Sequence, residues 1–463
     1  MRSVVSLGLL LAVPAAAQQA QAPAQPTPYQ RAIAAGYKAL TLCSAIFNAG
    51  RTQAQVEALE LRGIYPEYGA IVPALSVDVD DLLKTVEVTW SDDMPARLAT
   101  WRAGAGCAVQ PIGAVNTEPS AVASALADGA SVNFPPPLRL RPDPQPWPMG
   151  DRGIAPNPSR VTAAAVERAF DRATYGHGSE TVGVVVLRDG KVIAERYRDG
   201  FGPFTSNRTW SVAKSIAGTL VGMALRDAGV PVNRPTTNWS MMDDPRRAIT
   251  YDHLLRMASG LHSDTAGNRT DAIYFGGTTV PEQALGWPLE AAPGTRFRYA
   301  NNDTLLAVHS LSNLLGDRYS GYPRQALLNP LGMRNTVAET DWAGNYILSS
   351  QVWSTARDLA RLGQFWLQDG VWAGKRLLPQ GWVKYMTTPS GPQPASGPGY
   401  GATLWLFGPE QGLPQGSYAA RGNRGQYIMV IPSERLVVVR RGEDPGPARF
   451  DIAKFTADII AAK

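Results

Sequence analysis

Ser211 and Lys214 are the two residues of this sequence whose types and spacing point most directly to chemistry. They lie three positions apart in TWSVAKSIAG, residues 209–218, and on a helix this spacing places both side chains on one face. A serine hydroxyl is a weak nucleophile until a neighbour takes its proton, and a lysine can take it if burial lowers its pKa. The pair therefore predicts a nucleophile and its base at a helix start, where unpaired N–H groups favour negative charge. A helix-start serine followed by a solvated lysine gives the same pattern.

Two further segments could complete such a site. Tyr299-Ala300-Asn301 is the one Tyr-x-Asn in the sequence. A tyrosine beside a cationic lysine can ionise or relay a proton, and Asn301 can hydrogen-bond to both the lysine and a substrate. The segment GNRGQ, residues 422–426, opens a predicted strand, where glycines allow close backbone approach and a strand N–H can stabilise an oxyanion. Taken singly, the first segment could be a packed turn and the second an ordinary hairpin.

Taken together and in this order, the three segments resemble the motifs of the serine β-lactamase / penicillin-recognising superfamily. Its members carry Ser-x-x-Lys, then Tyr-x-Asn, then Lys-Thr-Gly or His-x-Gly on a strand. The sequence is most similar to the class C-like serine hydrolases of the esterase / 6-aminohexanoate-dimer hydrolase branch, over about residues 155–462, including PGTRFRYANND at 293–303. The resemblance implies an α/β (α+β) fold, in which a β-lactamase-like antiparallel sheet is flanked by helices and carries an inserted helical subdomain. It implies neither a cofactor nor a metal.

The resemblance also implies a role for each motif residue. Ser211 would attack a carbonyl and form an acyl-enzyme, and Lys214 would take its proton. Tyr299 would pass a proton to the leaving group and later help to activate the deacylating water. Asn301 would orient Lys214 and the substrate, and the backbone N–H groups of Ser211 and Gln426 would form the oxyanion hole.

The third motif departs from the superfamily pattern. Asn423 stands where a lysine or histidine is common, which puts β-lactam and D-Ala-D-Ala substrates in doubt. Arg424 could bind a carboxylate in its place through bidentate pairing, or it could be an ordinary surface arginine. The predicted substrate-binding residues are thus Asn301, Asn423, Arg424, Gly425 and Gln426.

The predicted activity is hydrolysis of an ester or amide of a small or linear substrate. Within the same chemistry, the alternative is a β-lactamase or D,D-peptidase, and the alternative of another class is a non-catalytic cell-envelope binding module. An α/β-hydrolase is disfavoured because the sequence has no Gly-x-Ser-x-Gly elbow.

The elements that must position these residues can also be read from the sequence. Residues 182–188 and 191–198 form two predicted strands around Asp189-Gly190, a strong hairpin signal. Helices are expected at 161–173, 210–225 and 450–462, and strands at 401–406, 426–431 and 436–441. Strands at both ends of a mostly helical middle predict one antiparallel sheet built from both ends of the domain.

Length and composition divide the chain into parts. With 463 residues, two or three domains are expected. We predict a small N-terminal α+β domain at 28–132, with a helix over 28–64 and strands within 75–110, then a proline-rich linker at 133–158 and the hydrolase domain at 159–463. Cys43 and Cys107 are the two cysteines, and in an exported protein an even count suggests a disulfide. Two free, buried thiols are the alternative.

The first residues predict export. Residues 1–17 combine Arg2, a short apolar run and a small-residue cleavage site, as in a signal peptide, and 18–27 resemble a flexible leader. An uncleaved anchor is the alternative. The expected location is periplasmic or secreted, with no stable membrane span after cleavage.

The net charge of +5 forms no basic stripe, so the expected partner is a small-molecule ester or amide, not nucleic acid. Four histidines and two cysteines without ligand spacing argue against a structural zinc.

Overall fold

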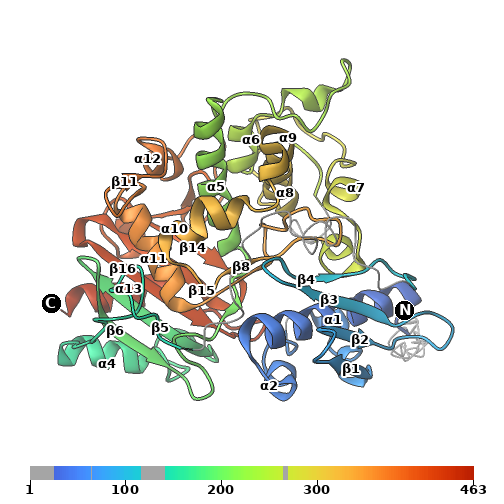
Figure 1. Ribbon diagram of the computed structural model, residues 1–463. Helices are drawn as coiled ribbons and strands as arrows, with labels where there is room; N and C mark the ends of the chain where they lie inside the picture. The colour runs from blue at the N-terminus through green and yellow to red at the C-terminus, as the bar shows by residue number, and fades with distance from the viewer. Residues whose placement is uncertain (1–24, 64, 116–140, 264–269, 463) are drawn as a thin grey trace, which may run out of the picture.

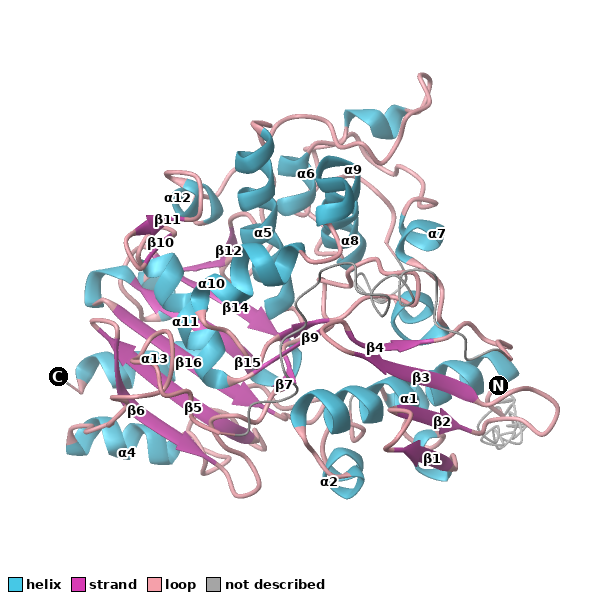
Figure 2. Ribbon diagram, viewed as in Figure 1, coloured by secondary structure: helices cyan, strands magenta, loops and turns pink. Residues whose placement is uncertain are grey.

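A computed structural model describes residues 25–63, 65–115, 141–263 and 270–462. Among these residues, the largest sheet has seven strands in the order β12-β13-β14-β15-β16-β5-β6, every pair antiparallel (Figure 2). The strands are β5 (Thr181–Arg188), β6 (Lys191–Tyr197), β12 (Gly399–Tyr400), β13 (Trp405–Phe407), β14 (Ser417–Gly422), β15 (Gln426–Ile431) and β16 (Leu436–Gly442). Because β16 pairs with β5, the sheet is built from both ends of the hydrolase domain, and the predicted fold class is confirmed.

Helices cover both faces of this sheet. Alternate residues of a strand point to opposite faces, and the apolar residues of β16 follow that rule, since Val437 and Val439 join one buried core and Val438 the other. Helix α11 (Ala356–Leu367) packs on the first face, and α4 (Arg160–Arg168) and α13 (Ile452–Ala461) lie on the second. The hairpin between β5 and β6 turns at Asp189 and Gly190, whose φ angles of 53° and 76° are those of the predicted tight turn.

A helical region stands above the sheet and carries α5 (Val212–Ala228) at its centre (Figure 1). Helix α5 ends at Gly229, which has a φ of 65°, as expected of a left-handed C-terminal residue. The other helices here are α6 (Tyr251–Leu255), α7 (Val280–Ala284), α8 (Asn301–His309), α9 (Leu311–Leu315), α10 (Asn329–Leu331) and α12 (Trp382–Met386). Short strands β7 (Asn207–Arg208), β8 (Val337–Ala338) and β9 (Val352–Ser354) form one small sheet, and β10 (Val371–Trp372) pairs with β11 (Lys375–Arg376).

The N-terminal domain packs one long helix on a small sheet. Helices α1 (Pro28–Ala49) and α2 (Gln53–Ala58) are followed by strands β1 (Val77–Asp80), β2 (Thr85–Val88), β3 (Arg97–Arg102) and β4 (Gly106–Val109), paired in that order. A disulfide joins Cys43 of α1 to Cys107 of β4. Within the described part of the chain, α1 is the one helix long and apolar enough to cross a membrane, but 94% of that stretch is buried inside the protein. It is therefore a core helix here. The predicted signal peptide lies outside the described residues.

Several predicted boundaries need correction. The helix expected over 28–64 is broken at Gly50, which has a φ of 65°, and the helix expected over 161–173 ends at Arg168. Of the strand expected at 401–406, residues 401–404 form a turn between β12 and β13, where Thr403 has a φ of 64°, and only 405–406 lie in a strand. Strand β14 was not predicted, because its sequence SYAARG lacks the branched residues that signal a strand.

The part of the predicted linker that the structure describes lies against the hydrolase domain. Arg361 of α11 donates to the carbonyls of Pro148 and Gly150 at 2.6 and 2.8 Å, and the Trp147 indole N–H donates to the carbonyl of Gly190 at 2.8 Å. These hydrogen bonds hold residues 147–150 against the hydrolase domain. Residues 116–140 lie outside the described chain.

Candidate active site

Ser211 stands at the start of α5, where a sharp turn presents it to a cavity. The preceding residue, Trp210, has a φ of 50°, a left-handed conformation that non-glycine residues adopt rarely. Backbone strain of this kind is concentrated at functional sites. Ser211 itself serves as the N-cap residue, and its side chain caps no backbone N–H of the helix. The hydroxyl is therefore available for other contacts.

Lys214 lies one turn further along and is buried, with 1% of its surface exposed. Its Nζ is 3.2 Å from Ser211 Oγ, 2.5 Å from Asn301 Oδ1 and 2.8 Å from the carbonyl oxygen of Ser349. Asn301 and Ser349 offer only acceptors here, so they take two N–H groups of the amine. A neutral amine has two N–H groups and one lone pair, which leaves the lone pair for the Ser211 hydroxyl.

The electrostatic surroundings favour this neutral form. Burial lowers the pKa of Lys214 to about 7, and the positive charge of Arg208 acts in the same direction. Arg208 lies on β7 just before the nucleophile, stacked 3.8 Å over the ring of Trp210 and donating to Ser350 Oγ at 2.7 Å. Arg208 could not be identified from the sequence, since an arginine near Ser-x-x-Lys gives no signal of its own until the fold brings it close.

Tyr299 and Asn301 reach the pair from the segment that opens α8. Asn301 is the first residue of that helix, and its side-chain N–H also donates to Thr270 Oγ1 at 3.3 Å. The ring of Tyr299 has its centroid 5.1 Å from Lys214 Nζ. Burial raises the pKa of Tyr299 to about 12, against the smaller opposite effects of a hydrogen bond with Ser211 and the charge of Arg421. The raised pKa keeps the phenol protonated, so of the two predicted roles proton relay fits Tyr299 and ionisation does not.

The third motif meets the nucleophile through β14, not β15. Gly422, the last residue of β14, lies so close to the start of α5 that an added Cβ would be 2.3 Å from the Thr209 carbonyl oxygen and 3.2 Å from the Ser211 nitrogen. Only glycine fits there. Asn423 follows at the tip of the β14–β15 hairpin and lines the cavity with Gly422. Gln426, which opens β15, pairs with Gly422 on the far strand and is absent from the described cavity lining.

Beyond Asn423, which is exposed, the residues of the hairpin turn are buried. Gln426 donates to the carbonyl of Gly442 and accepts from Arg441 Nε at 2.7 Å. Gly425 has a φ of 73°, and a Cβ there would lie 1.7 Å from an Arg440 nitrogen. Gly425 is therefore required by the buried Arg440–Asp444 ion pair beneath it, whose shortest distance is 2.7 Å.

Arg424 and Gly425 line the same cavity as Ser211, but the guanidinium of Arg424 is engaged by other groups. The guanidinium is ion-paired with the buried carboxylate of Glu443 and donates to the carbonyls of Leu59 at 2.9 Å, Glu443 at 2.8 Å and Asp444 at 3.1 Å. Only 6% of Arg424 is exposed. A guanidinium with these contacts has no pair of free N–H groups left to bind a substrate carboxylate in bidentate fashion. Arg424 is therefore neither the surface arginine nor the substrate-carboxylate ligand that the sequence suggested.

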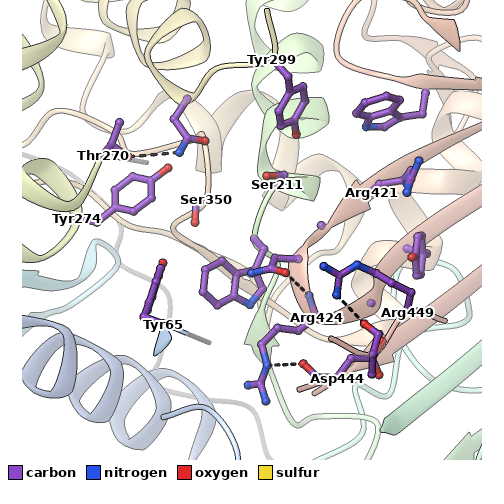
Figure 3. A pocket seen from close by; sticks show the side chains of 18 of the residues that line it. Tyr65, Ser211, Thr270, Tyr274, Tyr299, Ser350, Arg421, Arg424, Asp444 and Arg449 are labelled. Carbon is purple, nitrogen blue, oxygen red and sulfur yellow. Dashed lines mark hydrogen bonds between the residues drawn. The ribbon is translucent and has the colours of Figure 1, made fainter. Parts of the chain in front are cut away.

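A cavity of about 390 Å³ opens in front of Ser211 (Figure 3). Its walls mix aromatic rings with polar groups. Tyr274 and Ser350 stand with Tyr65 on one side of Ser211, and Arg421 lies on the other (Figure 3). The lining residues that sequence reasoning missed are Tyr65, Trp210, Thr270, Asp271, Tyr274, Ser350, Trp405, Arg421, Tyr427, Asp444, Ala448 and Arg449. Most come from loops or from β14, where single residues give no periodic signal.

Comparison with known families decides the classification. The profile described as Beta-lactamase matches residues 165–463, which is most of the hydrolase domain and more than half of the chain. The chain belongs to the beta-lactamase family. The match leaves the N-terminal domain outside it.

Relatives of this beta-lactamase family member agree with that placement. It is 27% identical over 291 residues to the 6-aminohexanoate-dimer hydrolase of Paenarthrobacter ureafaciens, an alignment that covers 57% of this chain and 72% of that protein. A solved penicillin-binding protein homologue from Caulobacter crescentus has a TM-score of 0.54 at 16% identity, covering 67% of this chain and 99% of that one.

A class C beta-lactamase in complex with cefoxitin has a TM-score of 0.51 at 13% identity, over 65% of this chain and 98% of that one. Identities this low in solved structures show a shared fold alone. Family membership supports serine hydrolase activity in general terms.

Proposed function

We propose that this beta-lactamase family member hydrolyses an ester or amide of a small or linear substrate through an acyl-enzyme on Ser211. The observation that carries the proposal is the set of contacts around Lys214. Two carbonyl-type acceptors hold its amine, and Ser211 Oγ lies 3.2 Å from the same nitrogen. A buried base beside a hydroxyl at a helix start is the arrangement that activates a serine.

The chemistry proceeds in two halves. Ser211 Oγ forms a bond to the substrate carbonyl carbon while its proton passes to Lys214 Nζ. The tetrahedral oxyanion is stabilised by the backbone N–H of Ser211 and, from the end of β14, by that of Asn423, which takes the place predicted for Gln426. Each such donor contributes roughly 10²–10³ in rate. As the carbonyl re-forms and the bond to the leaving group breaks, Tyr299 passes its proton to the leaving group and receives in its place the proton held by Lys214.

Deacylation repeats these steps with water. Water adds to the acyl carbon, and its proton leaves through the phenol of Tyr299 toward the lysine. Ser211 departs and regains its proton. Because the pKa of Tyr299 is raised to about 12, the phenol starts each half reaction protonated and acts as a relay, while Asn301 keeps the amine in position.

A pH profile of acylation tests the proposal. Only the neutral amine can accept a proton, and the pKa of Lys214 is lowered to about 7. We expect the second-order rate of Ser211 labelling by a small fluorophosphonate to rise about tenfold per pH unit below 7 and to level off above it. The adduct is located by peptide mass spectrometry. A labelling rate that does not change between pH 5.5 and 8.5, or an adduct on another serine, contradicts the assignment of Ser211 and Lys214 as nucleophile and base.

The substrate class is supported by several observations. The relative from Paenarthrobacter ureafaciens is named for hydrolysis of a 6-aminohexanoate dimer, and the third motif has Asn423 in place of the lysine or histidine common in the superfamily. Both favour linear esters and amides over β-lactams. The three aligned motifs also disfavour a non-catalytic binding module. The disulfide, with the signal-like start of the sequence, supports a periplasmic or secreted location.

Arg421 replaces Arg424 as the residue proposed to bind an anionic substrate group. It lies on β14, lines the cavity and stacks 5.1 Å over the ring of Trp405. We expect Arg421→Ala to lower kcat/KM for a p-nitrophenyl hemisuccinate roughly tenfold and to leave p-nitrophenyl butyrate within about twofold. Exposed Arg318→Ala is the control. Equal losses on both esters would assign Arg421 to packing instead, and wild-type turnover of a chromogenic cephalosporin faster than either ester would restore the β-lactamase alternative.

A further inference from the structure

The N-terminal domain packs against the hydrolase domain through buried side chains. Glu339 of the hydrolase domain is buried and accepts from Ser44 Oγ at 2.7 Å, Asn48 Nδ2 at 2.8 Å and the Cys107 N–H at 2.9 Å. Arg97 of β3 donates to the carbonyl of Phe275 at 2.9 Å. Apolar residues of both domains also form one continuous buried core. The two domains therefore hold a fixed relation near the cavity.

One segment of the N-terminal domain reaches the cavity itself. Tyr65 lines it together with Ser211 and Tyr274 (Figure 3). The centroid of its ring lies 6.5 Å from that of Trp210, in a tilted arrangement, and 5.7 Å from that of Phe275, in an edge-on arrangement. Tyr68 next to it donates to a carboxylate oxygen of Asp271 at 2.7 Å. The wall on this side of the nucleophile is therefore shared between the two domains.

The same segment is anchored to the hairpin of the third motif. Arg424 donates to the carbonyl of Leu59 at 2.9 Å, and Glu443, its ion-pair partner, accepts from Asn207 at 2.9 Å. Across the boundary, Glu60 is paired with Arg51 and is 4% exposed. Two ion pairs, one from each domain, thus lie buried at the junction, and the hydrogen bond from Arg424 holds Leu59 against the hairpin that borders Ser211.

We propose that the N-terminal domain contributes Tyr65 to the substrate cleft, and that Tyr65 is a specificity-determining residue that limits the size of the group bound beside Trp210. The substrate class that fits is a small ester or amide with a slim or flat apolar group on that side. Tyr65 and Trp210 would contact such a group with their rings, while a bulky branched group would collide with Tyr65. This inference rests on the proposed function of Ser211.

Opposite substitutions at Tyr65 provide the test. Tyr65→Ala enlarges the cleft and Tyr65→Trp narrows it, so the two variants should shift selectivity in opposite directions. The measured quantity is the ratio of kcat/KM for a bulky ester to that for a slim ester. Two ester series are used, one varying the acyl group from acetyl to diphenylacetyl and one varying the alcohol. In at least one series, we expect the ratio to rise about tenfold in Tyr65→Ala and to fall by a similar factor in Tyr65→Trp.

The controls separate this inference from misfolding and from the proposed function. Tyr65→Phe keeps the ring and should leave the ratio within twofold of wild type, and Tyr29→Ala removes a tyrosine of the same domain that is 58% exposed. Ratios unchanged in both series, or moved the same way by Tyr65→Ala and Tyr65→Trp, overturn the role of Tyr65. Wild-type turnover that does not depend on Ser211 overturns the proposed function instead.

Discussion

Ser211→Ala is expected to lower kcat/KM for the best ester substrate by roughly 10⁶-fold, the scale seen when a serine nucleophile is removed. The reason is that, among the described residues, Ser211 carries the hydroxyl that contacts Lys214. Ser350 also lines the cavity, but its Oγ accepts from Arg208 at 2.7 Å, whereas Ser211 Oγ lies 3.2 Å from the base. The residual rate should come from binding and oxyanion stabilisation alone.

The control for this variant is Ser215→Ala, one helical turn further along α5. Ser215 is buried and donates to the carbonyl of Thr403, so its loss removes a serine hydroxyl and one buried hydrogen bond but no reacting atom. Steady-state kinetics of both variants, with melting temperatures to show that each is folded, make the comparison. If Ser211→Ala keeps more than about a hundredth of the wild-type rate, Ser211 is not the nucleophile.

The sequence was sufficient for the parts of the site that lie within one element. Ser211 and Lys214 share a helix, and the spacing of three positions sets their relation. The Asp189-Gly190 turn and the branched strands around it similarly determine their hairpin locally. These features depend on periodicity and turn chemistry, which a single sequence displays directly.

The third motif shows why the rest could not be predicted. Its residues were recognised, but the strand beside the nucleophile was assigned as the one that follows them, since β15 has a clear apolar pattern and β14 does not. The structure reverses this assignment, because Gly422 is the residue that fits against Ser211. Which face of a hairpin meets a distant helix depends on tertiary packing, and no local pattern records it.

Arg424 and Tyr65 illustrate the same limit across domains. An arginine in a glycine-rich turn beside a predicted nucleophile suggested a substrate ligand. Its actual partners, Glu443 and the carbonyl of Leu59, are 19 and 365 positions away. A charged side chain can be buried only when it is paired and hydrogen-bonded, so the turn sequence specifies an anchor for the N-terminal domain, and Tyr65 reaches the cavity through that anchor.

Lys214→Met should separate the catalytic role of the lysine from its effect on stability. The side chain keeps a similar length but loses the base, so kcat/KM is expected to fall about 10²–10⁴-fold and the step in the pH profile near 7 to disappear. Lys384→Met, at an exposed position of α12, serves as the control. A variant that retains both the rate and the pH step would show that another group is the base.

The stability of the same variant should change with pH in a direction set by the buried amine. The pKa of Lys214 is lowered to about 7 in the folded protein, whereas an unfolded lysine titrates near about 10.4. Between these values the unfolded chain binds more protons, so the wild type gains up to about 1.4 kcal/mol of unfolding free energy per pH unit from this group. Below pH 7 the lysine is charged in both states and the full cost of burying that charge is present.

Urea unfolding at pH 6, 7, 8 and 9 tests this expectation. The free energy of unfolding of Lys214→Met should fall relative to that of the wild type as pH rises above 7. Parallel curves for the two proteins would mean that the folded lysine keeps its ordinary pKa, and the proposed base would then be protonated at neutral pH.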